Sequence, residues 1–434
     1  VGIFIMKDIK MNKKLTIKTK ITMSDVIEIL VCLQIWNTYT VLLKYGTLFR
    51  WGMVVCLVLQ ALYVRGNIVK HIRLSTEQKI WIVSLLYFWS GIIYSVNRQA
   101  TIKYCVSITT ASFLILVILK RGFYKKCYDF IYILLLFSLV TIYLNFLIPN
   151  LMTDYLSFLI PTSVRETLYN DVLGGIYSGI FADRANAAFG LNIGFAISYA
   201  KYITQADRQK KYLILAGLFF GGIIFTGKRT LLLIPVIIVL VSLMLKSDNK
   251  QNKRKYVAII ILCICAVVLL SVFPTLRTFF VRDGSDDLLN SRSTVLWPVA
   301  FKMFNSHKLL GTGINTYNSV LNSQNIMDAT LSTWSSHAHN IYIQMLGETG
   351  IIGFVLLVCI VIVNIRKTIK LLRRKNSESM QVLLIISLFI QLIWAVYGLT
   401  GNTFFYAQQL LCYLFALATK EAVNNEKGRS TDVS

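Results

Sequence analysis

The chain has 434 residues, of which 56% are hydrophobic and only 15% are charged. This balance excludes a soluble globular protein, because a water-soluble fold of this size cannot bury so many apolar side chains. At about 20 residues per span the apolar positions suffice for about twelve transmembrane helices, whereas a β-barrel would show short alternating segments. We therefore predict an all-α polytopic membrane protein.

Apolar runs that are predicted to cross the membrane follow one another along the chain. They cover residues 26–43, 47–64, 80–96, 104–119, 130–148, 187–204, 212–227, 230–245, 256–273, 340–364, 381–397 and 402–419. Most of the 45 Lys and Arg residues lie before the first span, after the last, or in alternate connections between spans. By the positive-inside rule both termini are predicted to be cytoplasmic. The net charge of +25 is thus topogenic, and no nucleic-acid partner is expected.

The segments around the spans define the predicted domain organisation. It consists of a basic cytoplasmic tail at 1–25, nine spans within 26–273, an outer loop at 274–339, three spans within 340–419, and a cytoplasmic tail at 420–434. A second long outer connection covers 149–186 within the first nine spans. Long connections are often functional. The loop before span ten is therefore the predicted catalytic loop, and it is expected to be partly helical.

One part of the catalytic loop has a helical pattern. In residues 291–305, Trp297, Phe301 and Phe304 would share one face of a helix. We predict an interfacial helix that lies on the outer leaflet. The cysteines fall mostly inside spans and none lies in an outer loop, so no disulfide framework is expected.

Three of the four histidines, His307, His337 and His339, lie in the catalytic loop. Histidine is the side chain best suited to exchange a proton near neutral pH. His337, His339 and the later Glu348 place polar groups at the start of a span, where desolvation is costly. They are the candidate catalytic residues. In a plainer interpretation, the two histidines near the span only cap or anchor it.

A His-X-His pair also suits a metal ion, but a metal site needs further ligands. The acidic residues on the same side are Asp283, Asp286, Asp287 and Asp328, and their spacing is not diagnostic. No metal and no other cofactor is predicted.

Arginines on the predicted outer face run against the topogenic charge bias. Arg229 lies in the tight turn between spans seven and eight, Arg184 just before span six, and Arg292 at the start of the amphipathic segment. A planar guanidinium binds phosphate oxygens in a bidentate manner. The alternative for each arginine is an interfacial position or an ion pair with Asp183 or Asp287.

An ordered set of short motifs resembles the O-antigen ligase and polymerase superfamily of bacterial membrane glycosyltransferases. In chain order the motifs are Gly179-Ile180-Phe181-Ala182-Asp183-Arg184-Ala185-Asn186, Thr226-Gly227-Lys228-Arg229, Arg292 with Trp297, Leu310-Gly311-Thr312-Gly313, His339-Asn340 with Tyr342, and Glu348-Thr349-Gly350 with Gly353. Taken without the family, Gly311-Thr312-Gly313 is predicted to be a turn that folds the loop back. Residues 1–150 resemble the superfamily only in being multispanning.

The resemblance implies a twelve-span enzyme whose outer loop caps a site for polyprenyl-diphosphate-linked glycans. Arg229 and Arg292 would hold the donor diphosphate, with Arg184 as a further phosphate ligand. His339 would orient or deprotonate the acceptor hydroxyl, supported by His337 and Glu348. Members of this superfamily transfer an oligosaccharide from undecaprenyl diphosphate without a nucleotide sugar or an obligatory metal, so no cofactor is implied.

The sequence favours a polysaccharide polymerase that acts on undecaprenyl-diphosphate-linked repeat units of a capsule, an exopolysaccharide or an O-antigen. A ligase of the same superfamily would use the same residues. A lipid-linked oligosaccharide flippase would place charged residues within the spans, and these positions are nearly free of charge here. Predicted partners are the lipid-linked repeat units and the bilayer, with a flippase and a chain-length regulator as further candidates. The predicted location is the bacterial plasma membrane, with the site on its extracytoplasmic face.

Overall fold

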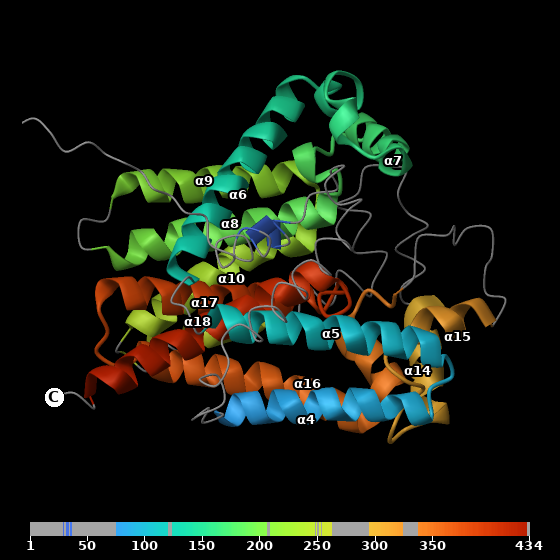
Figure 1. Ribbon diagram of the computed structural model, residues 1–434. Coiled ribbons are helices and arrows are strands. Elements are labelled where there is room, and N and C mark those ends of the chain that lie inside the picture. Colours follow the sequence, from blue (N-terminus) through green and yellow to red (C-terminus); the bar gives the residue numbers. More distant parts are fainter. Residues whose placement is uncertain are drawn as a thin grey trace, which may run out of the picture.

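The fold of the chain is seen in a computed structural model (Figure 1). The structure describes residues 75–119, 124–205, 209–247, 249, 251–252, 254–262, 295–323 and 337–431, together with the single positions 29, 32, 33, 35 and 36. Within these ranges every regular element is a helix and none is a strand. The predicted all-α class is confirmed.

The helices follow one another in an order close to that of the predicted spans. Their bounds are α4 Thr76–Ser90, α5 Arg98–Leu119, α6 Tyr124–Leu147, α7 Thr162–Leu173, α8 Arg184–Thr204, α9 Lys210–Phe225, α10 Arg229–Lys246, α14 Trp297–Ser306, α15 Tyr317–Ser323, α16 Ile341–Leu372, α17 Glu378–Tyr397 and α18 Ala407–Thr431. Short helical turns, η1 to η4, lie at Gly91–Ile93, Leu151–Tyr155, Ser157–Leu159 and Gly179–Phe181.

Four of the helices are long and apolar enough to cross a membrane. They are Lys126–Leu147, Arg229–Lys246, Ile341–Leu372 and Glu378–Tyr397. The chain is a multi-pass membrane protein. The count of twelve spans and the orientation stay predictions, because the predicted spans 26–43 and 47–64 and residues 263–273 lie almost wholly outside the described residues.

The start of the last helix differs from the prediction. The apolar run at 402–419 was expected to be helical throughout, yet α18 begins only at Ala407 and continues to Thr431. Residues 402–406 form a turn, because Trp394 Nε1 donates to the carbonyl of Thr403 and the Thr403 hydroxyl donates back to the carbonyl of Trp394. Tyr104 holds the same turn by donating to the carbonyl of Phe404 at 2.6 Å. This turn supplies polar groups to the site described below.

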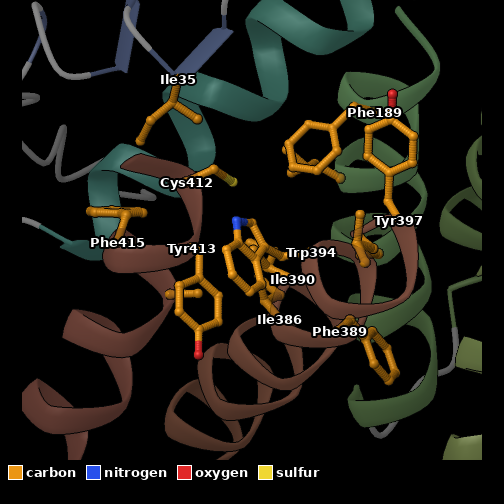
Figure 2. Close-up of a cluster of buried hydrophobic side chains, with 14 of the residues drawn as sticks. Ile35, Phe189, Ile386, Phe389, Ile390, Trp394, Tyr397, Cys412, Tyr413 and Phe415 are labelled. Carbon is orange, nitrogen blue, oxygen red and sulfur yellow. The ribbon is translucent and has the colours of Figure 1, made fainter. Parts of the chain in front are cut away.

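The long helices lie side by side in one bundle, with α14 and α15 at one end and α7 projecting beyond α6 (Figure 1). Helix α17 packs against α8, α16 and α18, and α18 packs against α5. Around α17 the rings of Trp394 and Tyr413 stack with centroids 4.3 Å apart, surrounded by apolar side chains of α8, α17 and α18 (Figure 2). In a bilayer such close packing, more than the hydrophobic effect, holds helices together.

Helix α14 confirms a helix within the amphipathic segment of the loop. Its first turn includes Pro298, whose fixed φ suits the start of a helix. Val299, Ala300 and Met303 are buried, and the helix packs against α16. Phe301 points away from this contact and is 43% exposed. The exposed Phe301 is compatible with the predicted interfacial position, which stays a prediction.

Charged residues form a polar cluster at the opposite end of the bundle from α14. The ammonium of Lys420 is fully buried, donates to Asn364 Oδ1 at 2.6 Å and lies 3.1 Å from the carboxylate of Glu421. A second ion pair joins Lys367 to Glu77 at 3.4 Å. These contacts tie α4, α16 and α18 together near their predicted cytoplasmic ends.

Candidate functional site

The candidate site lies where α16 begins. Asn340 caps this helix, and its side chain accepts from the backbone N–H groups of Tyr342 and Ile343. The residues before the cap are held from two sides, because Trp297 Nε1 donates to the carbonyl of Ala338 at 3.0 Å and Gln344 accepts from the Ala338 N–H at 3.0 Å. The position of the histidine segment is therefore set by α14 and by the first turn of α16.

His337 is half-buried against the turn that precedes α18. Its ring stacks on Phe405 with centroids 5.4 Å apart and meets Tyr406 edge-on at 5.8 Å. Nδ1 lies 3.2 Å from the amide nitrogen of Gln344. Burial lowers the pKa of His337 to about 4, so the imidazole is neutral at physiological pH.

His339 has a left-handed backbone conformation, with φ at +51°. A non-glycine residue in this region is strained and is often found at functional sites. Its Nδ1 lies 3.3 Å from the side-chain nitrogen of Asn402. The side chain is only partly buried, unlike that of Asn402, which is 1% exposed. This histidine is thus both oriented by the protein and accessible.

Glu348 lies one turn after Gln344 on α16 and is fully buried. Its carboxylate accepts from the backbone N–H of Asn315 at 2.6 Å, from the N–H of Tyr317 at 2.9 Å, and from Gln344 Nε2 at 2.9 Å. It therefore holds the 315–317 turn. It also contacts Gln344, the residue whose side chain lies beside the His337 ring. With no exposure, this carboxylate positions its neighbours and does not face a substrate directly.

Helix α16 is broken directly after Glu348. Gly350 has φ +60° and ψ −168°, a conformation that is almost restricted to glycine. The turn around Gly311 fits into this break, and Gly313 N donates to the Glu348 carbonyl at 2.8 Å. A Cβ atom on Gly311 or Gly350 would overlap the backbone of the other segment. The prediction that residues 311–313 turn the loop back is confirmed, and two motifs of the resemblance meet here.

Arg184 starts α8, capped by Asp183, whose carboxylate accepts from Asn186 N at 2.7 Å. The guanidinium is paired with Asp171 of α7 at 3.8 Å. The alternative drawn from the sequence for each arginine was an interfacial position or an ion pair with Asp183 or Asp287; in the structure Arg184 pairs with Asp171, and Asp183 caps α8. Asp287 lies outside the described residues. Burial raises the pKa of Asp171, and the charge of Arg184 acts against this shift, as does that of Lys228.

Arg229 is exposed at the start of α10. The turn before it is anchored to the α7–α8 connection, where Tyr177 N donates to the carbonyl of Phe225 at 2.9 Å. Because Lys228 and Arg184 both act on Asp171, the cationic residues of α8 and α10 share one region. Arg292 lies outside the described residues.

The segment 402–409 contacts both the cationic region and the histidines. Gln409 Nε2, at the start of α18, donates to Asn186 Oδ1 at 3.3 Å, and Asn402, in the turn before α18, contacts His339. The starts of α8 and α16 therefore lie at the same end of the bundle (Figure 1). Of the candidate residues, His337 and Glu348 both contact Gln344, His339 contacts Asn402, and Arg184 and Arg229 belong to the cationic region at the same end of the bundle.

Several residues of the site belong to none of the motifs found in the sequence. They are Asp171, Gln344, Asn402 and Gln409. An amide within an apolar run is the one available hint, because burying an unpaired amide is costly and implies a partner. The sequence could not name that partner.

The side chains of the site that could meet a ligand are cationic or neutral, because the Glu348 carboxylate is fully buried and that of Asp171 is paired with Arg184. Among the described residues, no group of three or more His, Cys, Asp or Glu side chains is arranged to hold a metal ion. Guanidinium and ammonium groups near a helix N-terminus favour an anionic ligand, and an accessible imidazole can exchange a proton with a hydroxyl group.

Residues 214–358 match a family model described as O-antigen ligase. The matched segment includes Arg229, the Gly311 turn, both site histidines and Glu348, while Arg184 precedes it. The match supports, over residues 214–358, the resemblance to the O-antigen ligase and polymerase superfamily. No curated protein matches the chain.

Proposed function

We propose that this chain, with its O-antigen ligase segment, is a metal-independent polysaccharide polymerase. It would transfer a glycan from undecaprenyl diphosphate to the non-reducing sugar hydroxyl of a second lipid-linked repeat unit. The acceptor oxygen forms the new bond to the anomeric carbon, the bond from that carbon to the diphosphate oxygen breaks, and undecaprenyl diphosphate leaves. The product would be a capsule, an exopolysaccharide or an O-antigen.

The leaving diphosphate would be held by Arg229 and Arg292, with Arg184 as a further contact. Negative charge grows on the leaving oxygen in the transition state, and fixed cations stabilise it. In the absence of substrate, the Asp171 carboxylate partly neutralises Arg184. A bound diphosphate would compete for this guanidinium with an oxygen pair of matching geometry.

His339 would accept the proton of the attacking hydroxyl. A general base of this kind needs one ring nitrogen with a free lone pair while the other keeps its proton. The carboxamide of Asn402 is next to Nδ1 and its oxygen has no other partner among the described residues. Turning this carboxamide so that its oxygen accepts from Nδ1 would keep the ring proton on Nδ1 and make Nε2 the basic nitrogen. His337 and Glu348 would keep this segment in place and not touch the reacting atoms.

The observation that carries the proposal is that the cationic region around Arg184 and the accessible His339 lie at the same end of the bundle, since Gln409 contacts Asn186 of α8 and Asn402 contacts His339. An acid–base group and a set of cations on one end of a membrane bundle suit a reaction that moves a glycan off a diphosphate. A flippase would instead need polar groups along a path through the bundle. We place the site on the extracytoplasmic face of the bacterial plasma membrane, with a flippase and a chain-length regulator as partners of the pathway.

The proposal can be tested with purified protein in lipid nanodiscs. The protein is incubated with the undecaprenyl-diphosphate repeat unit of its own strain, with EDTA and without nucleotide, and the glycans are separated on a gel. We expect a ladder for the parent chain and for His307→Ala, an exposed histidine on the same loop. His339→Ala should give none.

The outcomes separate the alternatives. A ladder that persists in His339→Ala would contradict the role of this histidine. Transfer of a whole glycan only to an added acceptor, without a ladder, would identify a ligase. Movement of labelled lipid across the bilayer without transfer would identify a flippase.

A further inference from the structure

A polar cavity lies next to His337. Its volume is about 380 Å³, within the range of small-ligand pockets. It opens where the start of α5 meets the 315–319 segment. The lining residues are Asn97, Gln99, Ala100, Lys103, Asn315, Asn318, Ser319 and His337.

The lining has the chemistry of a sugar site. It offers four carboxamides, a hydroxyl and an imidazole, groups that both donate and accept hydrogen bonds as sugar hydroxyls do. Lys103 is the one charged side chain among these described residues, and no carboxylate accompanies it. Its side chain is exposed, and an ammonium that meets no carboxylate among the lining residues favours a ligand that carries a negative charge.

The walls are fixed by hydrogen bonds between the two segments. Asn97 Nδ2 donates to Ser319 Oγ at 2.8 Å, and Asn97 Oδ1 accepts from Ala100 N at 3.0 Å. Asn315 Nδ2 donates to the carbonyl of Ala100 at 3.3 Å. A cavity whose walls are held in this way loses little conformational entropy when a ligand binds.

The cavity is connected to the proposed reaction centre. Asn315 presents its side chain to the cavity wall and its backbone N–H to Glu348. His337 lines the cavity and lies two residues from His339. The cavity therefore shares a wall with the histidine segment, and its lining includes none of the arginines proposed to hold the donor diphosphate. The donor leaves this cavity to the acceptor.

We propose that this cavity binds a carboxylated sugar residue of the acceptor glycan, with its carboxylate at Lys103. The inference rests on the proposed function, because only a transferase has an acceptor glycan. It adds a substrate class, a glycan that contains a uronic acid, and a residue that selects it. Lys103 touches the substrate away from the reacting atoms and acts on specificity.

The test measures binding without turnover, so that it does not depend on the polymerase assay. Methyl β-glucuronide and its neutral twin, methyl β-glucoside, are titrated separately against the full-length protein in nanodiscs, with saturation-transfer NMR as the readout. We expect the glucuronide to bind and the glucoside to bind more weakly. Lys103→Gln should weaken glucuronide binding by about fivefold, the size of one partly exposed charge contact.

Lys302→Gln is the matched control, because Lys302 is an exposed lysine of α14 that does not line the cavity. It should bind the glucuronide as the parent chain does. Equal affinity for the two sugars, or unchanged binding in Lys103→Gln, would overturn the selection of a carboxylate. Absence of saturation transfer from both sugars would overturn the sugar site itself. Selective binding by a protein that forms no ladder would support the cavity while contradicting the polymerase.

Discussion

Replacing Glu348 by Gln tests whether this carboxylate holds the site together. Glu348 Oε2 accepts from Asn315 N, whereas Oε1 accepts from Tyr317 N and from Gln344 Nε2. Glutamine keeps only one oxygen and turns an NH₂ group toward one of the two backbone donors. At least one hydrogen bond is therefore lost and one buried N–H group is left unpaired.

The magnitude follows from these contacts. A hydrogen bond to a charged group contributes about 1.5–3 kcal/mol, and a buried donor without a partner costs about 1–3 kcal/mol. Because the two figures overlap in what they count, we expect the free energy of unfolding to fall by about 2–3 kcal/mol. Since the same bonds fix Gln344 beside His337, polymer formation should fall by about tenfold or more, as 1.4 kcal/mol corresponds to a factor of ten.

Buried cysteines provide the assay. Cys105 and Cys412 lie inside the bundle, so a thiol-reactive dye labels them only as the protein unfolds. Heating Glu348→Gln with this dye should show a lower unfolding temperature than the parent chain, over a constant background from the exposed Cys359. Glu378→Gln, an exposed carboxylate at the start of α17, is the matched control and should change neither stability nor activity.

The reasoning would be refuted by an unchanged unfolding temperature in Glu348→Gln together with a complete loss of activity. That combination would mean that the carboxylate acts on the substrate and contributes nothing to the turn. An unchanged temperature with full activity would mean that the hydrogen bonds to Asn315 and Tyr317 carry no net stability.

Three further changes are expected to separate the roles of backbone, charge and protonation, each measured by the same thermal unfolding assay. Gly350→Ala should destabilise by about 1–3 kcal/mol, because alanine avoids this backbone conformation, whereas Gly217→Ala in open space on α9 should be neutral or slightly stabilising; equal effects would contradict the role of the break. Lys420→Ala should cost about 3–5 kcal/mol, because it leaves buried partners unpaired, and Lys420→Met should cost less by keeping the packing; equal losses in both would indicate that the charge dominates. Burial lowers the folded-state pKa of His337 to about 4, below the usual 6.5, so the stability gained from its neutral form is present above pH 6.5 and is lost as the pH falls toward 4. The stability advantage of the parent chain over His337→Gln should therefore shrink between pH 6.5 and 4. A pH-independent difference would contradict the burial of a neutral imidazole.

Local patterns explain why much of the fold could be predicted. The turn at Gly311 and the helix that starts near Trp297 depend on neighbouring residues. Both are seen where the sequence placed them. The start of α18 was missed because Asn402 to Tyr406 are as apolar on average as the helix that follows. The contacts of Thr403 with Trp394 and of Phe404 with Tyr104 hold this segment in a turn.

The sequence by itself determined the membrane class, the all-helical fold, the family resemblance and the candidate histidines and arginines, because hydropathy, charge bias and short motifs are local properties. Tertiary structure alone decided that Arg184 pairs with Asp171, that Asn402 contacts His339, and that Glu348 holds the turn at Asn315. Each of these contacts joins residues that are far apart in the chain or on different helices. Spacing along a sequence carries no record of which buried polar groups will meet, since any donor can satisfy any acceptor that packing brings within reach.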